Sequence, residues 1–175
     1  RIDFGSTVDI EIDQIRSDDG TLETRRTEIL FGDVSPVFNR KQGLMARGQI
    51  DRLPINEWAA FASAAAGSAG DDRADFPISF DVDVENLEML GRTFRRVNLK
   101  GGKTESSWQV SISGQQVLGD VTIPKAAPEQ AIVLNFERLM LEKAEAGKDL
   151  QPIDPRALPA INLTCDSLRF GGIDL

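Results

Sequence analysis

One strand pattern occurs three times in this chain of 175 residues, and it constrains the fold more than any other feature. The copies lie at residues 8–15, 80–87 and 161–168. Each alternates apolar with polar residues and ends on Ile or Leu. Such alternation is typical of a β-strand with one buried and one solvated face. A second phrase repeats by nearly the same shift, since residues 48–54 match residues 119–124.

The two phrases together predict a tandem array of β-rich units within a single domain, 1–175. The expected units are residues 1–74, residues 75–155 and a truncated third unit, 156–175. An array of this kind favours a modular surface over a single catalytic pocket.

The rest of the chain is also predicted to be mainly β. Residues 54–66 are expected to form one short α-helix, because Pro54 suits a first helical position and Gly67 suits the stop. Turns are expected at 101–103 and 114–115. The elements predict a curved antiparallel sheet of tandem repeats, either an open groove or an incomplete barrel. Strands are expected at 6–16, 22–31, 43–53, 78–88, 93–100, 108–113, 116–123 and 131–141.

Residues 131–145 fit both a helical and a strand period, and a strand through Leu141 is the preferred interpretation. Its apolar alternation is interrupted at Arg138 and runs through Ile132, Leu134, Phe136 and Met140.

The composition excludes several classes of function. The formal net charge is −8, whereas nucleic acid and anionic membrane surfaces require a basic face. Histidine is absent, which removes Ser-His and Cys-His nucleophile schemes and histidine metal sites. No cofactor motif is present, so the chain is predicted to be non-enzymatic and to need no cofactor. The only cysteine, Cys165, is expected to be a small core residue.

The chain is also expected to be a piece of a longer protein, because it starts at Arg1 without an initiator Met. Its most apolar stretch, residues 58–66, is too short to span a bilayer.

Acidic residues occupy the polar phase of the first two copies. Asp9, Glu11 and Asp13 share one strand face, and a solvated outer face accounts for them. A carboxylate-dependent hydrolase or a Ca²⁺-binding, lectin-like domain is a more distant hypothesis. It would rest on Asp81, Asp83 and Glu85. The third copy weighs against a shared catalytic role, because its first two acids are replaced by Asn162 and Thr164.

Six phrases from about Gly43 to the end resemble the YhdP-type branch of the AsmA-like proteins of Gram-negative bacteria. Their order and spacing carry the resemblance more than any single phrase does. They are residues 47–58 (RGQIDRLPINEW), 90–94 (LGRTF), 108–110 (WQV), 119–124 (GDVTIP), 134–139 (LNFERL) and 154–159 (DPRALP).

The resemblance implies a protein anchored in the inner membrane with a long periplasmic body. It implies phospholipid transport between the inner and outer membranes and maintenance of the outer-membrane barrier. The implied body is a bent β-sheet whose groove is lined with apolar side chains. Phospholipid acyl chains and adjacent repeats of the parent chain are the implied partners, and no catalytic or metal-binding residues are implied.

Eight apolar positions of the repeated strands are the candidate lining of such a groove. Filling of a closed core would produce the same alternation, so a structural or protein-interaction module without a ligand is the alternative. Alternating strands with few covering helices favour the groove hypothesis. The candidates are Val8, Ile10, Ile12, Phe80, Val82, Val84, Ile161 and Leu163.

Overall fold

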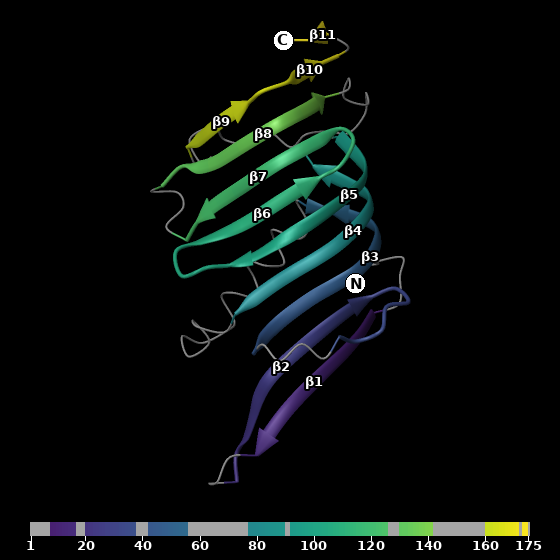
Figure 1. Ribbon diagram of the computed structural model, residues 1–175, viewed down its shortest axis with the longest axis vertical. Helices are drawn as coiled ribbons and strands as arrows, with labels where there is room; N and C mark the ends of the chain where they lie inside the picture. The colour runs from purple at the N-terminus through teal and green to yellow at the C-terminus, as the bar shows by residue number, and fades with distance from the viewer. Residues whose placement is uncertain are drawn as a thin grey trace.

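A computed structural model describes residues 8–16, 20–37, 42–55, 77–89, 92–125, 130–141, 160–171 and 173–174. In these residues eleven strands form a single sheet (Figure 1). The prediction of a mainly β chain is confirmed, and each expected strand coincides with an observed one. The strands are β1 (Val8–Arg16), β2 (Leu22–Phe31), β3 (Gly43–Pro54), β4 (Ile78–Met89), β5 (Arg92–Lys103), β6 (Ser107–Ser113), β7 (Val117–Pro124), β8 (Ile132–Leu141), β9 (Ile161–Cys165), β10 (Leu168–Phe170) and β11 (Ile173–Asp174).

The sheet is mixed, which corrects the prediction of a purely antiparallel one. β3 lies parallel to both β2 and β4, and β8 lies parallel to both β9 and β10. The remaining pairs are antiparallel. The outer strands β1 and β11 lie at opposite ends of the molecule and do not pair with each other (Figure 1), so the sheet is open.

The expected helix and the two expected turns have different outcomes. The expected helix at 54–66 lies almost wholly outside the described residues, and Pro54 is the last residue of β3. The expected turn at 101–103 is wrong, because these residues belong to β5. A Cβ atom on Gly101 would lie 2.1 Å from the Gln109 carbonyl oxygen, so glycine marks a close backbone approach here. The turn at 114–115 is confirmed between β6 and β7.

In several strands the alternation of buried and exposed side chains is interrupted, and the next buried residue comes three positions on instead of two. In β4 the buried residues Val84 and Leu87 are three positions apart instead of two. In β8 the buried residues are Phe136 and Leu139, beside a register shift on β7 between Leu118 and Gly119. A β-bulge of this kind moves the apolar phase by one. The expected alternation from Phe136 on to Met140 is therefore wrong.

An irregularity in the strand pairing lies at equivalent points of the three repeated copies. The register of β1 shifts between Asp13 and Gln14, and the third copy stops as β9 at Cys165 and resumes as β10 at Leu168. The division into units 1–74, 75–155 and 156–175 stays a prediction, but the copies share this structural feature as well as their sequence.

A buried ion-pair cluster holds the crossover between β2 and β3. Glu28 is 2% exposed, and its carboxylate accepts hydrogen bonds from Arg26 at 2.8 Å and Arg47 at 2.7 Å. The two guanidinium groups also donate to the carbonyls of Val37 and Ser35 respectively. The crossover is thereby tied to the polar face of the sheet.

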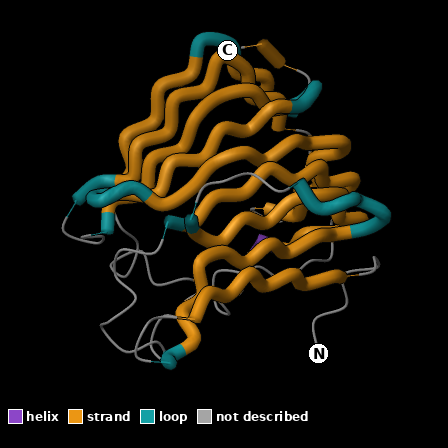
Figure 2. Tube along the Cα trace, turned by 60° about the horizontal axis from the view of Figure 1, so that its bottom comes forward, coloured by secondary structure: helices purple, strands orange, loops and turns teal. Residues whose placement is uncertain are grey.

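The sheet curls at one end. β5 pairs with β6 only from Asn98 onward, so the hairpin tip, defined here as the paired residues Met89 and Arg92, extends beyond β6. The guanidinium carbon of Arg92 nevertheless lies 5.7 Å from the ring centre of Phe170 in β10. Because β6, β7 and β8 separate β5 from β10 in the sheet, the hairpin tip must arch over the apolar face. Figure 2 shows the curvature of the strands.

Candidate apolar binding face

Two rows of laterally paired residues cross the sheet from β1 to β9 on the same face, with one residue from each strand. We call the two rows together the apolar face. The buried row consists of Val8, Phe31, Gly48, Val82, Leu99, Ile112, Gly119, Phe136 and Cys165. The half-exposed row consists of Ile10, Ile29, Ala46, Phe80, Gly101, Val110, Val121, Leu134 and Leu163.

Both rows lack polar side chains, with the thiol of Cys165 as the most polar group. Glycine replaces a side chain at three places where a neighbouring backbone comes close. An apolar strip therefore runs without interruption across nine strands.

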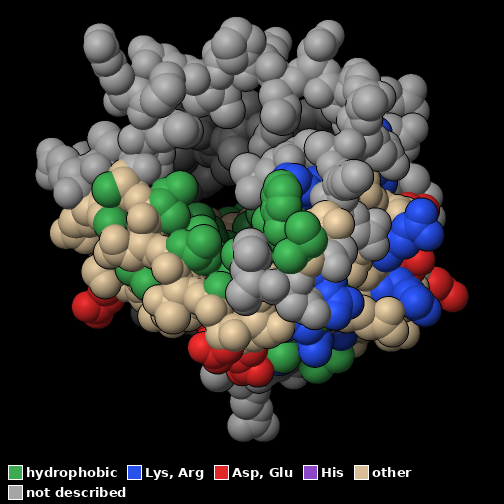
Figure 3. All heavy atoms as spheres, turned by 90° about the horizontal axis from the view of Figure 1, so that it is seen from above, with side chains coloured by type: hydrophobic (Ala, Val, Ile, Leu, Met, Phe, Trp, Pro, Cys, Tyr) green, Lys and Arg blue, Asp and Glu red, His purple; other side chains and the backbone are tan. Residues whose placement is uncertain are grey.

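Exposure changes along and across the apolar face. In the buried row the side chains of β2 and β4 to β8 are nearly inaccessible, apart from the glycine on β7. In the half-exposed row the central side chains are only partly covered, and the terminal Ile10 and Leu163 are 61% and 53% exposed. Figure 3 shows hydrophobic side chains gathered beside a hollow of the molecule. One part of the face is thus a closed core and the other is accessible.

A hollow of about 810 Å³ reaches this accessible part. Its apolar walls include Leu44, Ile78, Val110 and Val121, and polar residues such as Lys100 complete the lining. The volume falls within the range typical of small-molecule sites.

The opposite face is polar along an equally continuous row. This row places charged, amide or hydroxyl side chains on eight of its nine strands. Leu30 is the exception, and it is buried at 2%. The row consists of Asp9, Leu30, Arg47, Asp81, Lys100, Ser111, Asp120, Asn135 and Thr164.

Charged groups on the polar face pair with their neighbours. Asn98 donates to Asp81 at 3.1 Å and to Asp83 at 3.0 Å, and Lys100 donates to Asp81 at 2.9 Å. The hydrogen bond from Asn98, followed by that from Lys100, holds the pKa of Asp81 below its usual value. Within the described ranges, no group of three or more Asp, Glu or Cys side chains is arranged to hold a metal ion. Asp81 and Asp83 of β4 are therefore members of an ordinary polar strand face.

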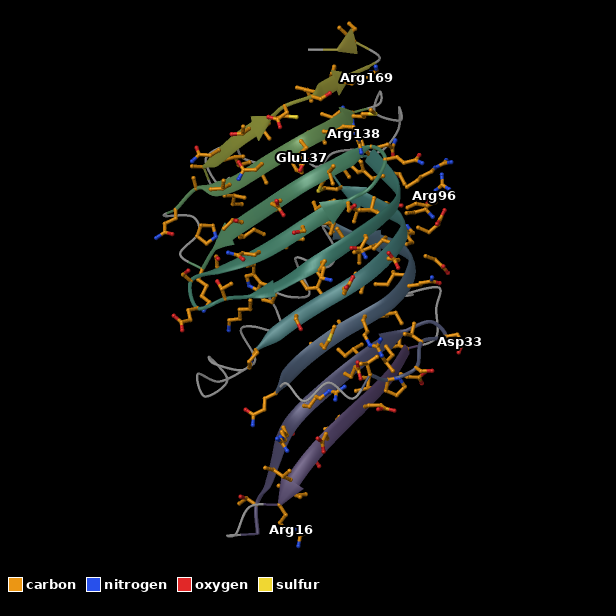
Figure 4. The ribbon with its side chains drawn as sticks, in the orientation of Figure 1. Arg16, Asp33, Arg96, Glu137, Arg138 and Arg169 are labelled. Carbon is orange, nitrogen blue, oxygen red and sulfur yellow. The ribbon has the colours of Figure 1, made fainter. Side chains whose placement is uncertain are left out.

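The labelled charged side chains in Figure 4 are spread over the sheet. Arg16, at the end of β1, and Arg169, in β10, lie near opposite ends of the molecule, and Arg96 lies at the side where the sheet curls. No candidate catalytic cluster is formed by these three.

The eight predicted lining residues all lie on the apolar face or in its direct continuation, but in two different environments. Val82 and Val84 are buried at 5% and 1%, and Phe80 is partly buried against the core. The other five are at the ends of the sheet and are 37% to 61% exposed. Those five are Val8, Ile10, Ile12, Ile161 and Leu163.

The sequence reasoning missed the central part of the face. Val110, Val121 and Leu134 connect the β4 candidates to the β9 candidates through paired neighbours. The period-two alternation that predicted their strands could have identified them. Gly101 could not have been found in this way, because it contributes backbone and no side chain.

No helix in the described part of the chain is long and apolar enough to cross a membrane.

These features define an open, curled β-sheet protein with one continuous apolar face. A family model described as YhdP protein matches residues 1–175, the whole chain. The chain therefore belongs to the YhdP family, which confirms the resemblance seen in its sequence and indicates an AsmA-like protein of the bacterial envelope. No curated protein and no solved structure was found to match the chain.

Proposed function

We propose that this chain is a non-enzymatic segment of a periplasmic AsmA-like protein whose parent is anchored in the inner membrane. Its apolar face shelters phospholipid acyl chains as they pass between the inner and outer membranes, and so helps to maintain the outer-membrane barrier. The observation that supports the proposal is the half-exposed row, which crosses nine strands without a polar side chain.

The dimensions of the row suit this role. At about 4.8 Å between neighbouring strands, nine strands span roughly 40 Å. An acyl chain lying on this row could move along it without meeting a polar side chain. Burial stabilises a bound chain by about 0.8 kcal/mol per methylene, so affinity does not require a specific headgroup site.

A structural module with a closed core is the second candidate, and the buried row favours it. Val82, Leu99, Ile112 and Phe136 are all at most 6% exposed, so this row fills the interior of the fold. In that case the module binds neighbouring protein segments and takes no lipid.

Single aspartates on the two faces of one strand separate the candidates. Leu163→Asp places a charge on the exposed end of the half-exposed row, and Thr164→Asp places the same charge on the polar face of β9. Ile10→Asp places a charge on the other exposed end of the half-exposed row, in β1. The purified chain and its variants are incubated with phosphatidylethanolamine–phosphatidylglycerol vesicles, separated from them, and examined by native mass spectrometry and lipid extraction.

We expect the wild-type chain and Thr164→Asp to retain phospholipid, and Leu163→Asp and Ile10→Asp to lose most of it while their circular dichroism is unchanged. A lipid-free wild-type chain, or equal lipid retention by all four proteins, would overturn the lipid proposal and favour the structural module.

A further inference from the structure

The apolar face is sealed along the side that lies beyond the buried row. Ile50, Val84 and Val97 follow the buried row on this side, and they pair laterally with one another. All three are at most 3% exposed. The hairpin tip lies on the same side and reaches β10, where Arg92 lies over the ring of Phe170. The accessible side of the face is therefore the opposite one.

The accessible side ends in a third row, two residues beyond the half-exposed row on each strand. We call this third row the open lip. Ile12 and Ile161, at its two ends, are 58% and 54% exposed, and the residues between them are partly buried. The open lip consists of Ile12, Thr27, Leu44, Ile78, Lys103, Trp108, Ile123, Ile132 and Ile161.

Lys103 is the charged residue of the open lip. It follows Gly101 on the apolar side of β5, because alternate side chains share a face, and it pairs laterally with Trp108. Its side chain lines the hollow of about 810 Å³ together with Leu44 and Ile78. A long apolar stem that ends in an ammonium group is suited to this boundary between apolar side chains and solvent.

The other basic residues that line the hollow belong to the polar face. Arg26 pairs there with Glu28, and Lys100 pairs with Asp81. Lys103 is thus the basic residue of the lining that lies on the apolar face.

A second ammonium group lies at the same corner of the molecule. Lys125 comes directly after β7, and its Nζ donates a hydrogen bond to the backbone carbonyl of Glu105, in the turn that follows Lys103. The two lysines outnumber the one carboxylate among these three residues. This corner is therefore locally positive in a chain whose net charge is −8, which favours an anionic group here.

We propose that Lys103 binds the phosphate group of a glycerophospholipid whose acyl chains lie on the apolar face. Its ammonium group donates charge-assisted hydrogen bonds to the phosphate oxygens, and the chains pack on Val110 and Val121 in the same hollow. The headgroup then lies at the open lip, and the chains point toward the sealed side. This inference rests on the proposed lipid-binding function, to which it adds the orientation of the lipid and the group that is recognised.

Three soluble probes separate the phosphate from the acyl chains. Dihexanoylphosphatidylglycerol carries both, dihexanoylglycerol carries the chains alone, and glycerol phosphate carries the phosphate alone. Isothermal titration calorimetry with the full chain, below the micelle concentration of each lipid, gives the three Kd values. We expect the wild-type chain to bind dihexanoylphosphatidylglycerol about tenfold more tightly than dihexanoylglycerol, and glycerol phosphate more weakly than either.

Substitutions of Lys103 test the assignment to this residue. Lys103→Gln should bind the two lipids equally, with the Kd for dihexanoylglycerol unchanged, whereas Lys103→Arg should keep the preference because a guanidinium group also binds phosphate. Arg95→Gln is the matched control. It removes one positive charge from an exposed position at the other end of the same strand, and it should keep the full preference.

Four outcomes would overturn the inference. A preference that persists in Lys103→Gln would exclude phosphate recognition by Lys103 and leave binding of acyl chains intact. Equal weakening of both lipids in Lys103→Gln would assign the residue a structural role. Glycerol phosphate bound as tightly as dihexanoylphosphatidylglycerol would identify a free phosphate ester as the ligand. A wild-type chain that binds neither lipid would overturn the proposed function and this inference with it.

Discussion

At the scale of single residues, Gly48 shows how closely the strands of this sheet approach one another. Its φ of +121° is rare for residues with a side chain, and a Cβ atom there would lie 2.0 Å from the carbonyl oxygen of Phe31. Gly119 is its counterpart in the second repeated phrase, and a Cβ on Gly119 would lie 2.3 Å from the carbonyl oxygen of Asn135. The repeated glycine therefore lets two neighbouring backbones meet in the buried row.

We expect Gly48→Ala to lower the free energy of unfolding by about 3 kcal/mol, because it combines an unfavourable φ with a clash against backbone. Gly20→Ala is the matched control. Gly20 has a φ of +88°, but nothing lies within 4 Å of its added Cβ, so the loss should be about 1 kcal/mol. Urea denaturation of both variants measures the difference. Equal losses would mean that the sheet adjusts to the Cβ of residue 48.

At the scale of elements, the parallel pairing of β2 and β3 depends on a crossover that the Glu28 cluster ties down. We expect Glu28→Gln to lower the free energy of unfolding by about 3 kcal/mol. The substitution removes the negative charge that pairs with Arg26 and Arg47 in a largely buried place. Glu88→Gln is the control, since it weakens the more exposed ion pair with Arg52 and should cost under about 1 kcal/mol. Thermal unfolding of the two variants at low and moderate salt provides the measurement. Similar losses in both would argue against a special role for the cluster.

Individual strands were predictable from the sequence, but their directions were not. The alternation in residues 78–88 indicates a strand whichever way its neighbours run, because period two describes faces and not partners. The length of the sequence between β3 and β4 was the feature that could have indicated their parallel direction. A connection this long allows a parallel pair, whereas a tight turn allows only an antiparallel one. The phase steps at Leu87 and Leu139 also escaped prediction, because a bulge depends on the neighbouring strand.

The candidate site was predictable to the same degree. Alternation placed Ile10, Val82 and Leu163 on one face correctly, but their exposures range from 5% to 61%. That difference arises from the position of each strand within the sheet and from the curl of the sheet. Neither is encoded in the strand's own residues.

At the scale of the whole molecule, the protection of backbone amides from hydrogen exchange is expected to decrease from the centre of the sheet to its two ends. Val84, Val97 and Val117 are at most 1% exposed, whereas β1 is exposed throughout and Ile173 of β11 is 66% exposed. Native-state hydrogen exchange should therefore be slowest in β4 to β7 and faster by at least about a hundredfold in β1 and β11. Uniform protection of all strands would indicate that the sheet opens only as a single cooperative unit.

The order of strands in the sheet follows the order of the chain from β1 to β8. Each of these strands can therefore bind to the strand made or delivered just before it. A polypeptide that emerges N-terminus first from a ribosome or a translocation pore could add one strand at a time, with each strand from β1 to β7 forming the edge to which the next one binds.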